Sequence, residues 1–353
     1  MNKKIFFTLL IFVLAFVISG CSITFQGAGG GNDGGVYVSS NQGNNWQQRT
    51  LVPTVSGSAQ NFGFLNAATL AMDPSDNKAL YFGSIDNGMY YTYDQTATWQ
   101  KVDELGQTTI RSIAVDAKDK CTIYVAIDNK VWKSDDCNRS WDQVYYDTDP
   151  KTVINTVVVD HYNNNIVYLG TSRGEIIKSS DKGGSWKTLQ RFASSVHKVS
   201  LSPFDSRIIF AVTAKNGVWR TFNSGSDWTG MEEKLADLES NVDFQDIEQP
   251  TSKKGLVFLA TNYGMLKSEN YGDTWSRVEL ITPEEDSVIN DMAVSPLNAN
   301  AIYYVTNTTF YRSLDGGENW TTKKLPTTRA GWKLIIGPEN DNIIYLAVRE
   351  IKD

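Results

Sequence analysis

SSDKGGSWKTL, residues 179–189, places a tryptophan directly after a polar turn, and the same arrangement recurs seven times along the chain. Every copy has Ser or Thr seven positions before the tryptophan and Asp or Asn five positions before it, and five copies have Gly three positions before it. The tryptophans follow one another at intervals of 42 to 53 residues, a period typical of repeat arrays and propellers. The paired positions are Asn41 and Trp46, Asp94 and Trp99, Asp136 and Trp141, Asp181 and Trp186, Asn223 and Trp228, Asn270 and Trp275, and Asp315 and Trp320.

Each repeat also contains short segments rich in Val, Ile and Tyr in a fixed order. In one repeat these are IRSIAVD (110–116), TIYVAID (122–128), KVWKS (130–134) and, after the turn, WDQV (141–144). Segments of this kind separated by turn residues are typical of β-strands, and no long helical periodicity competes with them. Four strands per repeat of about 45 residues predict an all-β fold, a β-propeller with four-stranded antiparallel blades.

The two ends of the repeat region determine the number of blades. Only GGVYVSS (34–40) precedes the first turn, so the N-terminal part supplies strands three and four of a blade. WKLIIGP (332–338) and IIYLAVR (343–349) follow the last full repeat and supply strands one and two. Six complete repeats and two complementary halves predict seven blades, with the halves pairing to close the ring and remove its open strand edges.

The recurring turn residues have a structural explanation. Asp and Asn side chains bond nearby backbone amides, and Gly adopts positive φ without strain. The tryptophan begins strand four, where it can fold back over the turn and fill space between blades. We therefore assign these fourteen positions to the scaffold rather than to a ligand.

The pattern SxDxGxxW resembles the Asp-box, or BNR repeat, over about residues 36 to 350. Asp-box propellers are similar to one another in fold and include sialidases, xyloglucanases, the sortilin ectodomain and the photosystem II assembly factor. The resemblance implies the seven-bladed propeller. It does not imply one function, because these families do different things.

The N-terminal segment MNKKIFFTLLIFVLAFVISGCS (1–22) has the form of an export signal. Its apolar run is about 14 residues, which is short for a membrane span. The ISGC ending resembles the bacterial lipoprotein box, which implies lipid attachment (palmitate) at Cys21; an ordinary signal peptide with a chance cysteine is the alternative. We expect a signal peptide over 1–20, a lipidated Gly-rich tether over 21–35 and the propeller over 36–353. The protein is then exported and held by its lipid alone at the bacterial cell membrane or outer membrane.

The charge and the cysteine content narrow the classes of protein to which this chain can belong. With 33 basic and 40 acidic side chains the formal net charge is −7, which argues against nucleic-acid binding. Cys121 and Cys137 lie eight residues to either side of a turn centred on Asn129, so they face each other across two strands. We predict a disulfide between them, with two free buried thiols as the alternative.

The sequence offers no clear catalytic centre. The only histidines, His161 and His197, lie far apart, and no His/Cys cluster has zinc spacing, so we expect no catalytic residue, metal or cofactor. Sialidases by resemblance need three arginines around a substrate carboxylate, whereas only Arg111 lies in an inner first-strand segment. Glycoside hydrolysis in general needs two carboxyl groups at a defined separation.

The longer loops, which connect strands two to three and four to one, share one face of the ring. Variable loops on a rigid scaffold are where binding usually resides, and these are rich in acid. We expect a non-catalytic, monomeric protein-binding or assembly platform at the envelope, with a basic protein partner or a glycan. The alternative is a glycoside hydrolase or carbohydrate-binding propeller. The candidate contacts on this loop face are Arg173, Lys215, Tyr263, Glu232, Glu233, Glu284 and Glu285.

Overall fold

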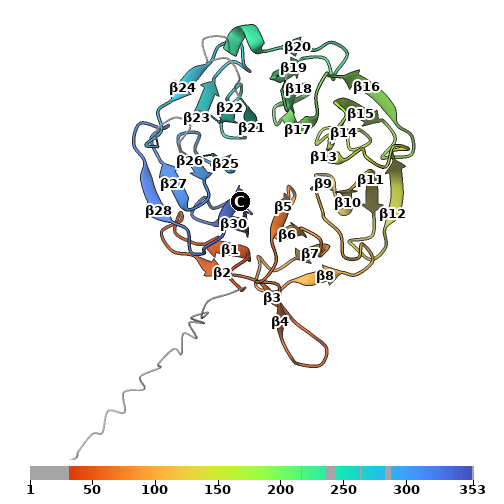
Figure 1. The fold of residues 1–353 in the computed structure, drawn as a ribbon, viewed down its shortest axis with the longest axis vertical. Helices are drawn as coiled ribbons and strands as arrows, with labels where there is room; N and C mark the ends of the chain where they lie inside the picture. Colours follow the sequence, from red (N-terminus) through yellow and green to blue (C-terminus); the bar gives the residue numbers. More distant parts are fainter. Residues whose placement is uncertain (1–31, 216, 236–242, 263, 283–287, 352–353) are drawn as a thin grey trace, which may run out of the picture. The chain divides into compact units, whose positions relative to one another are not determined.

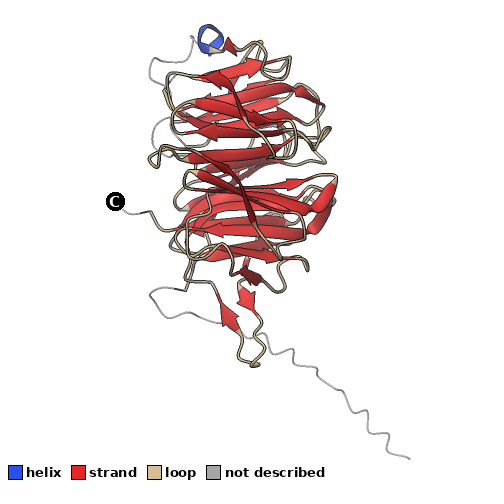
Figure 2. Cartoon of the chain, turned by 90° about the vertical axis from the view of Figure 1, so that its right-hand side faces the viewer, coloured by secondary structure: helices blue, strands red, loops and turns tan. Residues whose placement is uncertain are grey.

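The computed structural model describes residues 32–215, 217–235, 243–262, 264–282 and 288–351. The chain divides into a leading unit, Met1–Gly30, and a second unit, Gly31–Asp353, and the following description concerns the second. Seven four-stranded antiparallel sheets surround a common centre, which confirms the predicted propeller (Figure 1). Figure 2 shows the same blades edge-on. No helix in the described part is long and apolar enough to cross a membrane.

The first four blades follow the chain, each running from its inner to its outer strand. Blade 1 contains β5 (Ala67–Asp73), β6 (Asp76–Ser84), β7 (Met89–Thr92) and β8 (Gln100–Val102). Blade 2 contains β9 (Ser112–Asp116), β10 (Asp119–Ile127), β11 (Lys130–Ser134) and β12 (Asp142–Tyr146). Blade 3 contains β13 (Ile154–Val159), β14 (Val167–Thr171), β15 (Glu175–Ser179) and β16 (Lys187–Arg191). Blade 4 contains β17 (Val196–Ser202), β18 (Asp205–Thr213), β19 (Val218–Thr221) and β20 (Thr229–Gly230).

The remaining blades complete the ring. Blade 5 contains β21 (Phe244–Glu248), β22 (Val257–Thr261), β23 (Gly264–Ser268) and β24 (Ser276–Val278), and the 3-10 helix η1 (Glu232–Leu235) precedes it. Blade 6 contains β25 (Asp291–Val294), β26 (Ile302–Val305), β27 (Thr309–Ser313) and β28 (Thr321–Lys324). Blade 7 contains β29 (Ala330–Ile336), β30 (Ile344–Arg349), β1 (Gly35–Ser39) and β2 (Gln47–Gln48). A small hairpin, β3 (Leu51–Val52) with β4 (Gln60–Asn61), extends away from the ring between blades 7 and 1.

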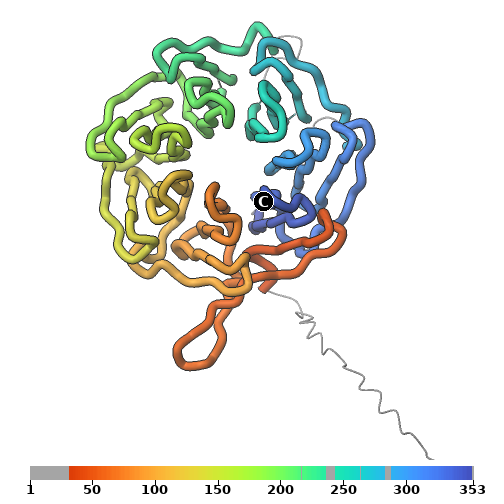
Figure 3. Tube along the Cα trace, turned by 180° about the vertical axis from the view of Figure 1, so that it is seen from behind, coloured from red at the N-terminus to blue at the C-terminus, as the bar shows by residue number. Residues whose placement is uncertain are grey.

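Blade 7 closes the ring with strands from both ends of the propeller, as the two half-repeats predict. β1 pairs antiparallel with β30 over five residues, with Tyr37 opposite Leu346. Figure 3 shows these first and last strands side by side. The closure therefore joins segments about 300 residues apart through main-chain hydrogen bonds.

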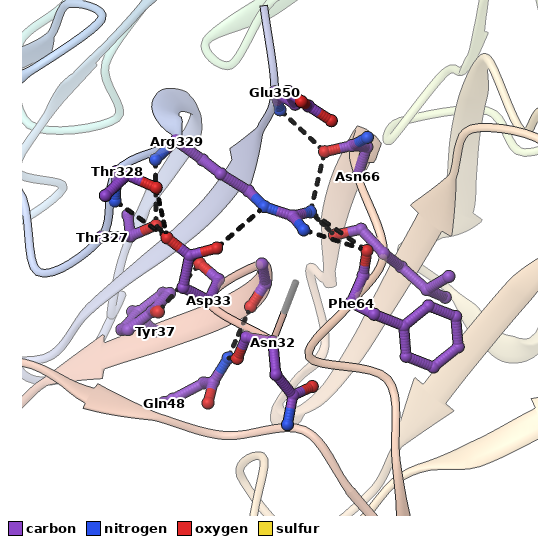
Figure 4. Close-up of polar contacts among 12 residues, drawn as sticks. Asn32, Asp33, Tyr37, Gln48, Phe64, Asn66, Thr327, Thr328, Arg329 and Glu350 are labelled. Carbon is purple, nitrogen blue, oxygen red and sulfur yellow. Dashed lines mark hydrogen bonds and ion pairs between the residues drawn. The ribbon is translucent and has the colours of Figure 1, made fainter. Parts of the chain in front are cut away.

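Side chains reinforce this seam next to the β1–β30 ladder (Figure 4). The buried guanidinium of Arg329 donates to the Asp33 carboxylate at 3.2 Å, to the Leu65 carbonyl at 2.9 Å and to the Asn66 side-chain oxygen at 2.8 Å. The Thr328 amide and hydroxyl donate to the other Asp33 oxygen. Burial alone would raise the pKa of Asp33, but the hydrogen bonds from Thr328 and Thr327 outweigh it and lower that pKa to about 2. This network ties the start of the ring to blade 7 and blade 1.

The Asp-box turn of blade 3 shows how the repeat builds each corner. Ser179 donates its hydroxyl to Asp181 at 2.8 Å and accepts the Gly183 amide at 2.8 Å, where Gly183 has a φ of +93°. Asp181 also accepts the amide and hydroxyl of Ser185. The Trp186 indole donates to the Val144 carbonyl of blade 2 at 2.8 Å, so the box locks one blade onto the preceding one.

Blade 2 departs from this pattern, because its box has no glycine. Cys137 and Asn138 adopt φ values of +60° and +70° there. The predicted disulfide between Cys121 and Cys137 is present and joins this turn to the neighbouring strand. The box of blade 1 also has no glycine, with Gln95 and Thr96 at φ values of +61° and +71°, so the covalent link rather than the missing glycine distinguishes blade 2.

Candidate active site on the inner wall of the ring

The loop-face residues expected to bind a partner do not assemble into one site. The Arg173 guanidinium is occupied by two buried acids, Asp147 after the last strand of blade 2 at 3.0 Å and Glu175 of blade 3 at 2.8 Å. Lys215 is exposed on the β18–β19 turn, and Glu232 and Glu233 are exposed on η1. No hydrogen bond or ion pair joins these four residues within the described ranges. Cys21, Tyr263, Glu284 and Glu285 lie outside the described residues, so their roles stay predictions.

A different set of polar residues gathers on the inner wall, which we define as the first strands of the seven blades. These strands (β5, β9, β13, β17, β21, β25 and β29) lie nearest the centre of the ring (Figure 1). Most begin with a register shift, a β-bulge, which re-aims one side chain. Aligned by strand register, the residues at this position form what we call the mouth ring: Ala68, Arg111, Asn155, His197, Gln245, Asn290 and Trp332.

The residues one step deeper are charged in four consecutive blades. Lys198 of blade 4 forms an ion pair with Asp246 of blade 5. Lys333 of blade 7 forms an ion pair of 2.5 Å with Asp291 of blade 6. The acids are only 4% and 6% exposed, whereas the lysines keep 34% and 30% of their side-chain surface accessible, so solvent reaches this layer from the lysine side.

Two carboxylates of this layer differ in how well they are satisfied. Asp291 accepts the Leu334 amide at 2.7 Å with one oxygen and Lys333 with the other. Asp246 pairs with Lys198 through one oxygen, while its second, enclosed oxygen has no hydrogen-bond partner among the described residues. A buried carboxylate oxygen without a donor is energetically costly, so Asp246 is less well satisfied than Asp291.

Glu248 adds a third carboxyl group on the same face of β21, two residues after Asp246. Burial raises the pKa of Glu248 to about 7, helped by the negative charges of Asp246 and Asp291 and opposed by Lys198. Burial also raises the pKa of Asp291 to about 6. Burial would raise the pKa of Asp246 as well, but the Lys198 charge outweighs it and the net pKa is lowered. Near neutral pH the cluster thus holds a half-protonated acid beside two ionised ones.

A cavity of about 300 Å3 opens at the mouth ring on the side of blades 7, 1, 2 and 3. Its wall includes Arg111, Asn155, Trp332 and Arg349, together with Ile85 from a strand two-to-three turn, so it lies on the loop face. The Arg349 guanidinium stacks 3.6 Å from the centre of the Trp332 ring. Trp332 directly precedes Lys333, so the cavity lies beside the charged layer.

The acids of the inner wall were not among the predicted site residues, although the sequence contains a signal for them. The segment FQDIEQP (244–250) carries acids at alternating positions of a first strand, where the equivalent positions of blade 3 hold the uncharged Thr156 and Val158. His197, which lies far from His161 in the sequence, is part of the mouth ring, and burial lowers its pKa. Within the described ranges, no group of His, Cys, Asp and Glu has the arrangement of a metal site.

Xyloglucanases are among the known proteins that this chain resembles in sequence and in fold. No known family profile matches the chain. The chain is 23% identical over 319 residues to the xyloglucanase Xgh74A of Acetivibrio thermocellus, covering 79% of this chain and 36% of that enzyme. The chain thus spans about a third of the length of this curated relative.

Solved structures show the same fold. The GH74 xyloglucanase of Xanthomonas campestris superposes with a TM-score of 0.65 at 14% identity, covering 81% of this chain and 51% of the enzyme. YCF48 with a bound D1 peptide superposes with a TM-score of 0.63 at 15% identity, covering 82% of this chain and 94% of YCF48. Both pairs are similar in fold and distant in sequence.

The expectation of a non-catalytic assembly platform is therefore wrong. The sequence relatives are xyloglucanases, and they favour the alternative, a glycoside hydrolase. The expectation failed because it relied on acidic loops and on missing motifs, whereas the inner wall carries carboxyl groups that the repeat pattern conceals.

Proposed function

We propose that this protein is a carbohydrate-active propeller of the glycoside hydrolase type, acting on a xyloglucan-like polysaccharide from the mouth of the ring. The observation that carries the proposal is the split between Glu248, half-protonated near neutral pH, and Asp246, held ionised by Lys198, on one strand. Paired carboxyl groups with separated pKa values are what acid–base hydrolysis of a glycosidic bond requires. The similarity to xyloglucanases supports the substrate class.

Each carboxyl group has a defined task in this scheme. Glu248 gives its proton to the glycosidic oxygen as the bond from that oxygen to the sugar carbon breaks. A water molecule activated by the Asp246 carboxylate forms the new bond to the same carbon and gives its proton to that carboxylate. Lys198 and Lys333 hold the two aspartates ionised and in place.

Release of reducing ends from xyloglucan tests the proposal. The purified propeller should release them, and Glu248→Gln should lower kcat by roughly 10²–10⁴-fold, the usual contribution of a general acid. Glu232→Gln is the matched control, because this glutamate is exposed on η1 and lies outside the charged layer. A wild-type protein without hydrolysis would overturn the enzymatic proposal; xyloglucan binding without release would instead assign a carbohydrate-binding propeller.

A further inference from the structure

The charged side chains that line the cavity at the mouth ring are all positive. Among the residues that line it, both charged ones are arginines, Arg111 and Arg349, and none is acidic. This contrasts with the formal net charge of −7 for the whole chain. A cationic recess on an acidic protein favours an anionic ligand by electrostatic complementarity.

The two guanidinium groups are available for such a ligand. Other arginines of the ring are engaged: Arg173 by Asp147 and Glu175, and Arg329 by Asp33 and backbone carbonyls. Within the described ranges, the side chains of Arg111 and Arg349 have no hydrogen bond or ion pair to protein groups. Arg111 is exposed and Arg349 is half-buried, so the N–H groups of both side chains are accessible to a bound molecule.

Trp332 fixes the direction of one of these donors. The Arg349 guanidinium lies 3.6 Å from the ring centre, and the Trp332 indole N–H is itself held by the Ala68 carbonyl at 3.1 Å. A stacked guanidinium keeps its in-plane N–H groups free for a planar, two-oxygen acceptor. Burial lowers the pKa of Arg349, and an anionic ligand would offset that cost.

We infer that the mouth cavity binds the carboxylate of an acidic sugar, a uronosyl residue of the polysaccharide, between Arg111 and Arg349. The inference rests on the proposed carbohydrate function and adds to it a charged group that the glycan carries, a uronosyl residue. A cavity of about 300 Å3 lies at the small end of ligand pockets, which are roughly 300–1,000 Å3, and suits one such residue rather than a long chain. The Asn155 side-chain NH2 donates to Ser195 and the Val196 carbonyl, and the Thr109 hydroxyl donates to Asp86, so the two arginines are the donors left for the carboxylate.

Calorimetric titration with three sugars tests this inference on the intact propeller. The probes are glucuronosyl xylotriose, xylotriose without the uronosyl group, and a neutral xyloglucan heptasaccharide. We expect the acidic sugar to bind at least about tenfold more tightly than xylotriose, since hydrogen bonds to charged groups are the stronger ones. That preference should shrink with added salt.

Variants locate the site. Arg111→Gln and Arg349→Gln should each remove about tenfold of the preference for the acidic sugar while leaving xylotriose binding unchanged. Arg349→Lys keeps the charge but not the two-pronged geometry and should give an intermediate loss. Arg191→Gln is the control, an exposed arginine paired with Glu175 on blade 3.

The outcomes separate this inference from the function on which it rests. Binding of the heptasaccharide without any preference for the acidic sugar overturns the inference and leaves the proposed function standing. A preference that survives in both arginine-to-glutamine variants also overturns it, because the carboxylate then binds elsewhere. Failure of all three sugars to bind overturns the proposed function and the inference together.

Discussion

The carboxylates of the Asp-boxes and those of the inner wall occupy opposite environments in the same blades. Asp181 is exposed, accepts three hydrogen bonds within its own turn, and has its pKa lowered to about 2, chiefly by the Ser185 hydroxyl and amide. Glu248 faces the centre of the ring, and burial raises its pKa to about 7. The Asp181 carboxylate receives its hydrogen bonds from its own turn, whereas the Glu248 carboxyl group depends on charged residues of neighbouring blades.

The difference teaches where to look for chemistry in a repeat protein. The box arrangement recurs in blade after blade, with Asp136 and Asp315 held in the same manner as Asp181. The charged layer of the inner wall occurs on one side of the ring, where the first strands depart from the apolar pattern. Residues that recur in every blade build the scaffold, whereas residues that differ between blades are the better candidates for function.

The largest expected effect is on the scaffold side. Trp99 is fully buried, packs against Phe62 and donates its indole N–H to the Arg49 carbonyl at 2.9 Å. Trp99→Ala should lower the free energy of unfolding by about 3–5 kcal/mol, measured by urea denaturation. Trp320→Ala, at a half-buried box tryptophan, should cost less. Equal losses at the two sites would show that burial does not rank the boxes.

The disulfide of blade 2 comes next, because it adds a covalent link to a box turn that has no glycine. Cys121 and Cys137 enclose a loop of 16 residues, for which loop entropy predicts about 3 kcal/mol. The double variant Cys121→Ser, Cys137→Ser should lower the urea midpoint, and a reductant should have the same effect on the wild type but none on the variant. An unchanged midpoint in the variant would contradict a stabilising role for the link.

The pH dependence of stability compares the two kinds of carboxylate directly. The folded-state pKa of Glu248 is raised from 4.5 to about 7, so the wild type loses stability as pH rises through this window. Glu248→Gln should therefore match the wild type near pH 5 and exceed it near pH 8, by up to about 3 kcal/mol.

Asp181→Asn provides the opposite case. The folded-state pKa of Asp181 is lowered from 3.8 to about 2, so its stabilising effect is fully present above pH 4 and disappears as pH falls through 2. The difference between this variant and the wild type should stay constant from pH 5 to 8. Thermal unfolding at several pH values measures both variants, and a Glu248→Gln difference that does not change with pH would falsify the raised pKa.

The smallest effect is expected within the box turn. Ser179 is buried and bonds both Asp181 and the Gly183 amide at 2.8 Å, so Ser179→Ala should cost about 1–2 kcal/mol. Ser185→Ala, at an exposed hydroxyl of the same turn, should cost less. The ranking of these two variants by urea denaturation tests whether the buried serine organises the turn.

The fold could be predicted from the sequence because its signals are local and repeated. The tryptophan spacing, the turn residues and the two half-repeats determine the blades, their number and their closure. The candidate site could not be predicted in this way. Asp246 and Asp291 meet their lysines across blade boundaries, 48 and 42 residues away, and only the ring brings such positions together. Arg329 likewise contacts Asp33 and Leu65, which precede it in the sequence by 296 and 264 residues.

The closure of blade 7 determines how late in synthesis the ring can form. β1 is synthesised at the start of the ring and β30 at its end, so the edge of β1 opposite β2 has no partner until Ile344–Arg349 have left the ribosome. At about 5–20 residues per second, roughly 15–60 s separate the two strands. During this interval the first strand is an open edge, and contacts so distant in sequence also form slowly. The last few seconds of synthesis therefore decide whether the chain closes on itself or pairs with another chain.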